Sequence, residues 1–313
     1  MNVEALLDPE IATALAAMPA FRPFTFAELP AMRTERAAQV ATVELSDQVE
    51  RRTYSVPGAP GAPEVTIRVH RPKASAGPLP CIYFMHGGGY VMGSAAMDDL
   101  RFDKWCPLLN CVGVSVEYRL APETPYPGPL EDCYAGLAWV HGNAATLGVD
   151  PARIGIGGAS AGGGLAAGLA LLARDLGQVP LAFQLLIYPM IDDRRTTASS
   201  AWDVPIWPPG SNERGWAAYL GGLSNGDVPA YAAASRATTL AGLPPAQIVV
   251  GALDGFLDED VDYAMRLTHA GVPTELHVFP GAPHGFDGIM PGTVLARRAR
   301  QVMEAWLGRV LRA

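Results

Sequence analysis

A single serine lies among glycines and alanines in RIGIGGASAGGG, residues 153–164. Within it, GASAG (158–162) matches the pattern G-x-S-x-G, in which a serine at a sharp turn between a strand and a helix serves as a nucleophile. The flanking residues predict that context, because 153–157 form a short apolar run and 161–177 have helical spacing. The pattern alone also occurs by chance, so a plain backbone turn and a phosphate-binding loop are alternatives to be weighed.

Glycines two positions before and after Ser160 would relieve clashes at such a turn and lift the hydroxyl above the sheet edge. The turn also leaves the backbone N–H of Ala161 at a helix N-terminus, where it can donate to developing negative charge. Ser160 is therefore the candidate nucleophile, and Ala161 is a candidate hydrogen-bond donor.

The phosphate-loop alternative uses the same glycines, since Gly155-x-Gly157 and its successors resemble a loose G-x-G-x-x-G. That motif needs an acidic residue at the end of the next strand, about 20 residues further along. Asp175 has the right separation but falls within LLARDLG, which has helical spacing. The sequence thus disfavours dinucleotide binding, and with it an NAD-dependent oxidoreductase.

Three consecutive glycines follow a predicted strand at 81–85, in MHGGGY (85–90). Packing does not require such a run, whereas a backbone whose successive N–H groups point into one space does. HGGG-type loops supply oxyanion-hole donors beside a G-x-S-x-G serine. His86 and Gly87 come at the start of this loop, and we interpret them as its support, with His86 fastening the loop and not acting as the base.

A serine hydroxyl becomes a good nucleophile only when an imidazole accepts its proton and a carboxylate orients that imidazole. His284, in GAPHGF, follows a predicted strand at 274–279 and so belongs at the carboxyl edge of the sheet, where Ser160 is expected. His284 is therefore the candidate base. The other histidines lie in or beside strands and helices and are predicted to be structural: His70, His86, His141, His269 and His277.

Four carboxylates follow the predicted strand at 247–252, in VVGALDGFLDED (249–260). Asp254 comes first and can reach across the sheet edge toward His284, whereas Asp258 is suited to cap the following helix. Asp254 is the candidate acid, and the chain order Ser160, Asp254, His284 is the one expected for an α/β-hydrolase.

Metal and thiol chemistry find little support. No pair of histidines has zinc-site spacing with a supporting Cys or Glu, so no metal or other cofactor is predicted. The four cysteines are predicted to be buried hydrophobic residues and neither a disulfide framework nor a nucleophile. They are Cys81, Cys106, Cys111 and Cys133.

Short apolar runs alternate with helical stretches along the chain, which indicates an α/β fold with a doubly wound, mostly parallel sheet. No repeat or Gly/Ser linker divides the chain. The predicted strands are 64–70, 81–85, 112–118, 153–157, 182–188, 247–252 and 274–279, and the predicted helices are 130–148, 161–177, 258–271 and 293–312.

Two segments depart from this alternation. Residues 1–45 are helix-like and precede any predicted strand, and residues 192–240 hold three of the six tryptophans without a convincing strand. Both fit a lid over the carboxyl edge of the sheet, where open α/β folds bind ligands. The alternative for 192–240 is a long surface loop with no functional role.

The composition of the chain limits the classes of partner that the protein is expected to bind. The chain has 313 residues, 49% of them hydrophobic, and a net charge of −8 without any basic stretch, so a nucleic-acid partner is not expected. The opening MNVEALLDPE does not resemble a secretory signal, and the longest apolar run, 159–173, is shorter than the roughly 18–20 residues that span a bilayer. We therefore expect no membrane association and a cytoplasmic location.

Together these residues resemble the hormone-sensitive-lipase-like branch of the α/β-hydrolases, the bacterial family IV carboxylesterases. The resemblance runs from about residue 64 to the end and implies an α/β-hydrolase fold of about eight strands with a helical cap. It also implies Ser160, Asp254 and His284 as the triad, with Gly88, Gly89 and Ala161 as oxyanion-hole donors. The motifs are HGGGY (86–90), VEYRLAPETPYPGPLEDCYAGLAWV (116–140), GGASAGG (157–163), LLIYPMID (185–192), LPPAQIVVGALDGFLDED (243–260) and GAPHGF (281–286).

Two positions depart from the family pattern. The family usually has Asp or Thr before the serine, where this chain has Ala159, and commonly has Pro after the triad aspartate, where this chain has Gly255. Neither change removes a catalytic group, although Gly255 predicts a less rigid loop. In the YRLAPE stretch, Arg119 and Glu123 are expected to pair with each other as part of the scaffold.

The resemblance also assigns the flanking segments. Residues 1–45 would be N-terminal cap helices, and residues 46–313 the catalytic domain, with a cap insertion at about 192–240. Edge strands and C-terminal helices would allow a homodimer. The candidate pocket walls, for which simple core packing is the alternative, are Tyr90, Met92, Tyr188, Trp207 and Phe286.

The predicted function is that of a serine carboxylesterase, which hydrolyses small to medium carboxylic esters through an acyl-enzyme on Ser160. Its partner is a small-molecule ester, and no cofactor is required. Two alternatives use the same fold: an amidase or peptidase with the same triad, and a ligand-binding receptor that has lost a triad member. All three triad residue types are present here, which favours an enzyme.

Overall fold

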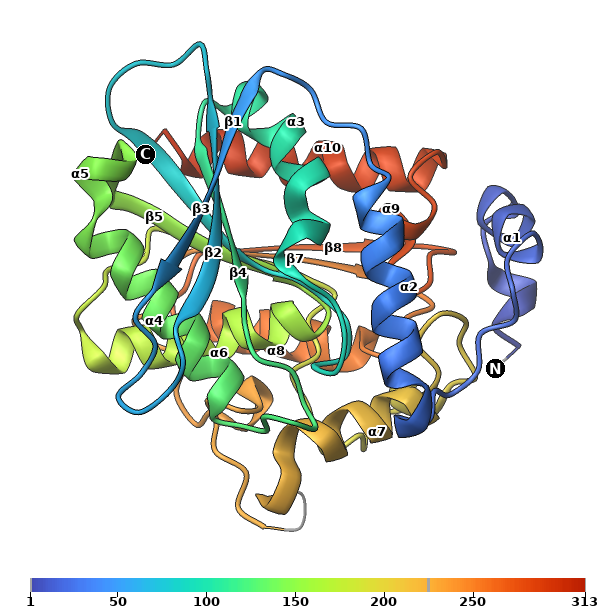
Figure 1. Cartoon of the computed structure of the whole chain (residues 1–313). Coiled ribbons are helices and arrows are strands. Elements are labelled where there is room, and N and C mark those ends of the chain that lie inside the picture. The colour runs from blue at the N-terminus through green and yellow to red at the C-terminus, as the bar shows by residue number, and fades with distance from the viewer. Residues whose placement is uncertain (1, 224–225, 313) are drawn as a thin grey trace.

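The computed structural model describes residues 2–223 and 226–312. Outside the described residues lie residue 1 of the predicted N-terminal cap (1–45), residues 224–225 of the predicted insertion (192–240) and residue 313 at the end of the predicted catalytic domain (46–313). Eight strands form one sheet in the order β1-β2-β4-β3-β5-β6-β7-β8 (Figure 1). The pairs β1–β2 and β2–β4 are antiparallel and the other pairs are parallel. The strands are β1 (Val49–Val56), β2 (Val65–Pro72), β3 (Leu79–Met85), β4 (Val112–Glu117), β5 (Val149–Ala159), β6 (Gln184–Ile187), β7 (Ala246–Gly251) and β8 (Thr274–Phe279).

Helices cover both faces of the sheet, which confirms the predicted α/β class (Figure 1). Helices α4, α6 and α8 pack on one face and α3 and α10 on the other. None of the helices in residues 2–223 and 226–312 has the length and apolar character needed to cross a bilayer. The helices are α1 (Pro9–Ala16), α2 (Leu29–Ala41), α3 (Asp99–Leu109), α4 (Gly128–Gly142), α5 (Ala144–Leu147), α6 (Ala161–Leu176), α7 (Pro209–Leu220), α8 (Leu257–His269), α9 (Phe286–Ile289) and α10 (Val294–Val310).

The centre of the sheet lies where the strand order reverses. β3 pairs with β4 on one side and with β5 on the other. The chain therefore crosses from β3 to its neighbour on one side and then, after β4, to its neighbour on the opposite side. The register places Met85, the last residue of β3, opposite Gly158 near the end of β5. The loops after these two strands therefore begin side by side, at the kind of switch point where α/β sheets bind ligands.

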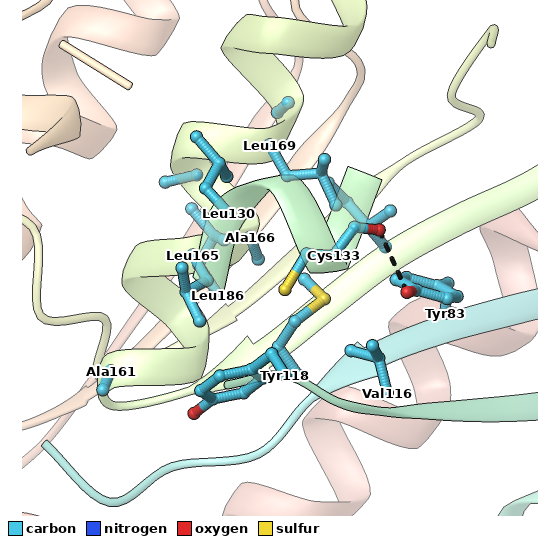
Figure 2. Close-up of a cluster of buried hydrophobic side chains, with 14 of the residues drawn as sticks. Tyr83, Val116, Tyr118, Leu130, Cys133, Ala161, Leu165, Ala166, Leu169 and Leu186 are labelled. Atoms are coloured by element: carbon cyan, nitrogen blue, oxygen red, sulfur yellow. Dashed lines mark hydrogen bonds between the residues drawn. The ribbon is translucent and has the colours of Figure 1, made fainter. Parts of the chain in front are cut away.

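A buried core holds α6 against this part of the sheet (Figure 2). Leu165 and Leu169 of α6 share a cluster with Tyr83 of β3 and Cys133 of α4, and the Tyr83 hydroxyl donates to the Cys133 carbonyl at 3.0 Å. A buried tyrosine needs such a partner for its hydroxyl. The same cluster includes Ala161, so the N-terminus of α6 is packed in place.

Strand β1 and helix α3 were not predicted from the sequence. β1, VERRTYSV, alternates irregularly and leaves much of its length exposed, because it is an edge strand with only β2 as a neighbour. α3 was missed because its sequence, DLRFDKWCPLL, has a proline inside the helix and a weak apolar stripe. Both elements lack the clear periodicity that sequence reasoning requires.

The expected pairing of Arg119 with Glu123 is wrong. Arg119 instead donates through Nε and Nη2 to both carboxylate oxygens of Asp132, at 2.8 and 2.7 Å. Glu123 accepts from Arg33 of α2, at 2.8 and 2.9 Å. Arg119 and Glu123 therefore attach the loop after β4 to two different helices, because Asp132 belongs to α4 and Arg33 to α2.

The two segments outside the regular alternation meet above the loop after β3. In α2, Arg33 donates to the carbonyls of Val91 and Ala121 at 2.8 and 2.9 Å, which attaches this helix to the loops after β3 and β4. The ring of Phe24 lies 6.0 Å from that of Trp207, just before α7. Residues 1–45 and 192–240 are thus in contact with each other near this edge of the sheet.

Candidate active site

Ser160 connects β5 to α6 and has a strained backbone. β5 ends at Ala159 and α6 begins at Ala161, and Ser160 between them has φ 57° and ψ −122°. A residue with a side chain adopts such angles at a cost of about 1–3 kcal/mol, so the surroundings must enforce them. The Ser160 N–H donates to Ile187 at 2.9 Å, and its carbonyl accepts from Gly164 and Met190 at 3.0 and 2.9 Å.

The glycine at 162 is required by the close approach of α6 to the end of β3. A Cβ atom at this position would overlap the carbonyl oxygens of Met85 and His86. The first turn of α6 therefore packs directly on the backbone that enters the glycine loop. This contact brings Ser160 next to the loop HGGGY.

Ser160, His284 and Asp254 form one chain of hydrogen bonds, although they are far apart in the sequence. Nε2 of His284 lies 2.9 Å from Oγ of Ser160, and its Nδ1 lies 2.7 Å from Oδ2 of Asp254. All three side chains are buried. With the proton on Nδ1 donated to Asp254, Nε2 is free to accept the proton of the serine hydroxyl, as nucleophilic catalysis requires.

Two aromatic rings contact the His284 imidazole, and one backbone amide donates to the Asp254 carboxylate. The His284 ring lies edge-on to Tyr188 and Phe256, with centroids 4.8 and 5.0 Å away. The second oxygen of Asp254, Oδ1, accepts the N–H of Phe256 at 3.0 Å. The imidazole is thus restrained by two ring contacts, and the carboxylate has a second partner besides the histidine.

Asp258 does not cap α8 as the sequence suggested. The helix begins at Leu257, so Asp258 lies inside its first turn, and its Oδ2 instead accepts the N–H of Ser199 at 2.8 Å. The Ser199 hydroxyl donates to the carbonyl of Gly255 at 3.0 Å and accepts the N–H of Asp258 at 3.1 Å. These bonds restrain the loop at Gly255, where the family commonly has proline.

The other two carboxylates of this stretch are not part of the hydrogen-bond chain through His284. Glu259 accepts the N–H groups of Ile191 and Asp192 at 3.0 and 3.1 Å. Asp260 is fully buried, and burial raises the pKa of both carboxyl groups well above the ordinary range. Neither hydrogen-bonds to His284, so Asp254 is the only carboxylate of the four in contact with it among the described residues.

The loop after β3 presents unpaired N–H groups beside Ser160. The carbonyl of Gly88 accepts from Val91 and Met92 at 3.1 and 3.0 Å, which closes the loop into a tight turn. Within the described residues the N–H groups of Gly88 and Gly89 donate to no protein acceptor. With the N–H of Ala161 at the start of α6, they form a set of donors suited to an oxyanion, each worth about 3 kcal/mol when aimed at the transition state.

His86 supports this loop through contacts of its ring and its backbone carbonyl. Its Nδ1 lies 2.9 Å from the carbonyl of Gly87, and its ring stacks on Tyr118 with centroids 4.1 Å apart. The Tyr118 hydroxyl donates to the His86 carbonyl at 2.6 Å. Burial lowers the pKa of His86 to about 4, so the imidazole is neutral at pH 7. These contacts are those of the supporting role proposed for His86 and Gly87.

Gly89 has φ 60°, and a Cβ there would overlap the ring of Trp207. Gly89→Ala is therefore expected to displace the loop, so that its N–H no longer points at the oxyanion, and to lower kcat by about 100-fold, the effect of losing one oxyanion donor. Steady-state hydrolysis of p-nitrophenyl butyrate measures it. Gly292→Ala, where an added Cβ meets no atom within 4 Å, is the control and should keep kcat. Unchanged kcat in Gly89→Ala would argue against the donor role.

A cavity of about 420 Å³ opens onto Ser160 and His284. Three of the five side chains predicted for its wall line it: Met92, Tyr188 and Trp207. Side chains that were not predicted for the wall also line it, chiefly from the N-terminal segment and from the residues just before and in the first turn of α3: Phe21, Arg22, Phe24, Met32, Arg36, Met97, Asp98 and Arg101.

For Tyr90 and Phe286 the predicted place in the cavity wall is wrong. Tyr90 stacks on Tyr219 of α7 with centroids 3.9 Å apart and donates its hydroxyl to Met190 at 2.8 Å. Phe286 packs on Phe279 at the end of β8. Both rings are fully buried in the core, where these contacts hold them.

The described residues offer no metal site and no reactive thiol. Residues 2–223 and 226–312 contain no group of three or more His, Cys, Asp or Glu side chains that could hold a metal ion. All four cysteines are buried, as predicted. Burial raises the pKa of the Cys81 and Cys133 thiols, which disfavours the thiolate that nucleophilic chemistry needs.

Comparisons with known proteins agree with this geometry. The sequence pattern of a family described as alpha/beta hydrolase fold matches residues 82–288. Carboxylesterase NlhH of Mycobacterium tuberculosis is 39% identical over 244 residues, covering 76% of this chain and 75% of the relative. Esterase LipI of the same species is 35% identical over 260 residues, covering 77% and 81%.

A solved structure titled Bacterial Heroin Esterase superposes with a TM-score of 0.94 at 43% identity, covering 100% of both chains. Because this superposition covers the whole of both chains, the structural similarity includes residues 1–45 and 192–240 as well as the sequence motifs. The chain therefore belongs to the alpha/beta hydrolase fold family, in its hormone-sensitive-lipase-like carboxylesterase branch.

Proposed function

We propose that this carboxylic ester hydrolase cleaves small to medium esters through an acyl-enzyme on Ser160, with His284 as general base and Asp254 as the group that orients it. Ester hydrolysis itself follows from the family and its named carboxylesterases. The observation that carries the finer proposal is the hydrogen-bond chain from Ser160 through His284 to Asp254, at the foot of a cavity of about 420 Å³.

In the first half of the reaction, Oγ of Ser160 attacks the ester carbonyl carbon while its proton passes to Nε2 of His284. The carbonyl oxygen becomes an oxyanion and accepts hydrogen bonds from the N–H groups of Gly88, Gly89 and Ala161. The protonated imidazole then donates to the leaving alcohol oxygen as the C–O bond breaks. The alcohol departs, and the acyl group remains esterified to Ser160.

In the second half, a water molecule repeats the attack. Nε2 of His284 takes a proton from the water as its oxygen bonds to the acyl carbon, and the same donors stabilise the second oxyanion. The proton returns to Oγ of Ser160 as the carboxylic acid leaves. Asp254 remains ionised throughout and stabilises the imidazolium that forms in each half.

The size of the cavity supports the substrate range. A volume of about 420 Å³ is within the range of small-molecule sites. Its walls are largely apolar and are contributed by Met92, Tyr188 and Trp207 together with N-terminal residues. Such walls suit the acyl and alcohol parts of a compact ester. The cytoplasmic location and the homodimer stay predictions.

Initial rates on p-nitrophenyl esters from acetate to palmitate, with one p-nitroanilide, test the proposal. We expect kcat/KM to be highest for short to medium acyl chains and to fall for palmitate, because a long chain exceeds the cavity. The anilide should be cleaved far more slowly, since its leaving group is poorer. A maximum at palmitate would contradict the size range, and equal rates on the anilide would indicate an amidase.

A further inference from the structure

One positively charged group in the cavity wall has no counter-charge among the described residues. Three arginines line the cavity: Arg22, Arg36 and Arg101. Arg22 pairs with Glu28, and Arg101 pairs with Asp98 at 3.3 Å. Arg36 forms no ion pair with any described carboxylate, and its hydrogen-bond contact is Nη1 to the sulfur of Met92, at 3.7 Å. A thioether sulfur is a weak acceptor, so most donors of this guanidinium have no acceptor among the described residues.

The position of Arg36 is set by a well-anchored helix. Arg33, one turn earlier on α2, is tied to the loop after β3 and to Glu123. Residues three and four apart share a helix face, so Arg36 lies on the side of α2 that also carries Met32, another residue of the cavity wall. The side chain is thus directed at the cavity by the packing of α2.

The charges around the cavity do not balance this cation. Asp98 is the one carboxylate among the described lining residues, and it is already engaged by Arg101. Burial raises the pKa of Asp98 to about 6, which weakens its negative charge further in mildly acidic solution. The cavity therefore has an excess of positive charge, whereas the whole chain carries −8.

Partial burial of a cation that has no counter-charge costs free energy, unless a bound ligand supplies that charge. Burial lowers the pKa of Arg36, consistent with a charged group whose hydration has been reduced and not replaced. An arginine presents a planar fork of donors that matches a carboxylate. A phosphate dianion would need more than the single uncommitted cation that this wall offers.

We propose that Arg36 is a specificity-determining residue that binds a free carboxylate on the substrate, so that the preferred substrates are half-esters of dicarboxylic acids. This inference rests on the proposed function, because it assigns the substrate class of the same site. The ester end would lie at Ser160 and the carboxylate end at Arg36. The apolar side chains of the cavity wall would contact the methylene chain between them.

Three esters that differ at the far end of the acyl chain test this: ethyl hexanoate, monoethyl adipate and ethyl 6-aminohexanoate, which are neutral, anionic and cationic. Monoethyl succinate and suberate vary the span. Release of acid is followed in a pH-stat at pH 7.5. The unaltered enzyme should give its highest kcat/KM with an anionic half-ester and its lowest with the cationic ester.

Arg36→Gln should lower kcat/KM for the best half-ester by about tenfold or more, as expected for one charge-assisted hydrogen bond, mainly through KM. Ethyl hexanoate should change less than twofold, and Arg36→Lys should retain part of the preference for the anion. Arg52→Gln is the matched control. Arg52 pairs with Glu50 on β1 and is not among the lining residues, so its removal changes the net charge equally and should leave the preference intact.

The outcomes distinguish failure of the role proposed for Arg36 from failure of the proposed ester hydrolysis. If p-nitrophenyl acetate is hydrolysed but the half-esters are not preferred over ethyl hexanoate, the inference about Arg36 fails alone. Equal losses on neutral and anionic esters in Arg36→Gln would assign Arg36 a structural role and overturn it as well. If no ester is hydrolysed, the proposed function fails and this inference fails with it.

Discussion

Replacing Ser160 with alanine is expected to lower kcat for p-nitrophenyl butyrate by about 10⁶-fold, the loss typical of removing the serine from such a triad. The physical reason is that the acyl group then has no nucleophile to which it can transfer. The backbone donors and the cavity would remain, so a small residual rate above that of water should persist. KM should change little, because Oγ contributes mainly to the transition state.

A covalent label distinguishes loss of the nucleophile from loss of structure. An organophosphonate should add its mass to the Ser160 peptide of the unaltered enzyme and to no peptide of Ser160→Ala. Ser235→Ala is a suitable control, because Ser235 is also buried but its hydroxyl has no hydrogen-bond partner among the described residues. This variant should keep both activity and labelling. Labelling at another serine would contradict the assignment.

Asp254→Asn is expected to lower kcat by about 10⁴-fold. Oδ2 of Asp254 accepts from Nδ1 of His284 at 2.7 Å, which keeps the proton on Nδ1 and leaves Nε2 free to act as a base. An amide nitrogen in its place would donate to Nδ1 and move the proton to Nε2. The imidazole could then no longer accept the proton of Ser160. Steady-state kinetics on p-nitrophenyl butyrate measure the loss.

Asp258→Asn is the matched control, four residues further along the chain. Its carboxylate accepts the Ser199 N–H at 2.8 Å and does not contact His284. We expect kcat within a few-fold of the unaltered enzyme and a free energy of unfolding lower by about 1 kcal/mol, the usual net value of one hydrogen bond. Urea denaturation measures the second quantity. A large loss of kcat in Asp258→Asn with none in Asp254→Asn would mean that the wrong carboxylate was chosen.

The candidate site could be read from the sequence because its chemistry depends on local backbone patterns. Ser160 lies at a strand-to-helix turn that glycines at 158 and 162 permit, and these are neighbours in the chain. His284 and Asp254 each follow a strand, and parallel strands bring their carboxyl ends to one edge. The order of elements therefore predicts that the three side chains approach one another, without knowledge of any side-chain contact.

The errors arose where a residue's role depends on contacts distant in sequence. Glu123 pairs with Arg33, 90 residues away, and not with Arg119, four residues away. Tyr90 donates to Met190, 100 residues away, and so turns into the core. An aromatic residue beside a glycine loop has the same local sequence whether it faces a cavity or the core, so the sequence could not distinguish the two.

By itself, the sequence determined the fold class, the reaction type and the residues proposed for the triad, because strand–turn–helix patterns and chain order are encoded by neighbouring residues. Only the tertiary structure decided the shape and charge of the cavity, including the guanidinium of Arg36, which pairs with no described carboxylate. The reason is that the N-terminal helix α2 and the segment before α7 close over the sheet edge from opposite parts of the chain. Which of their side chains find partners, and which are left facing the cavity, follows from that packing.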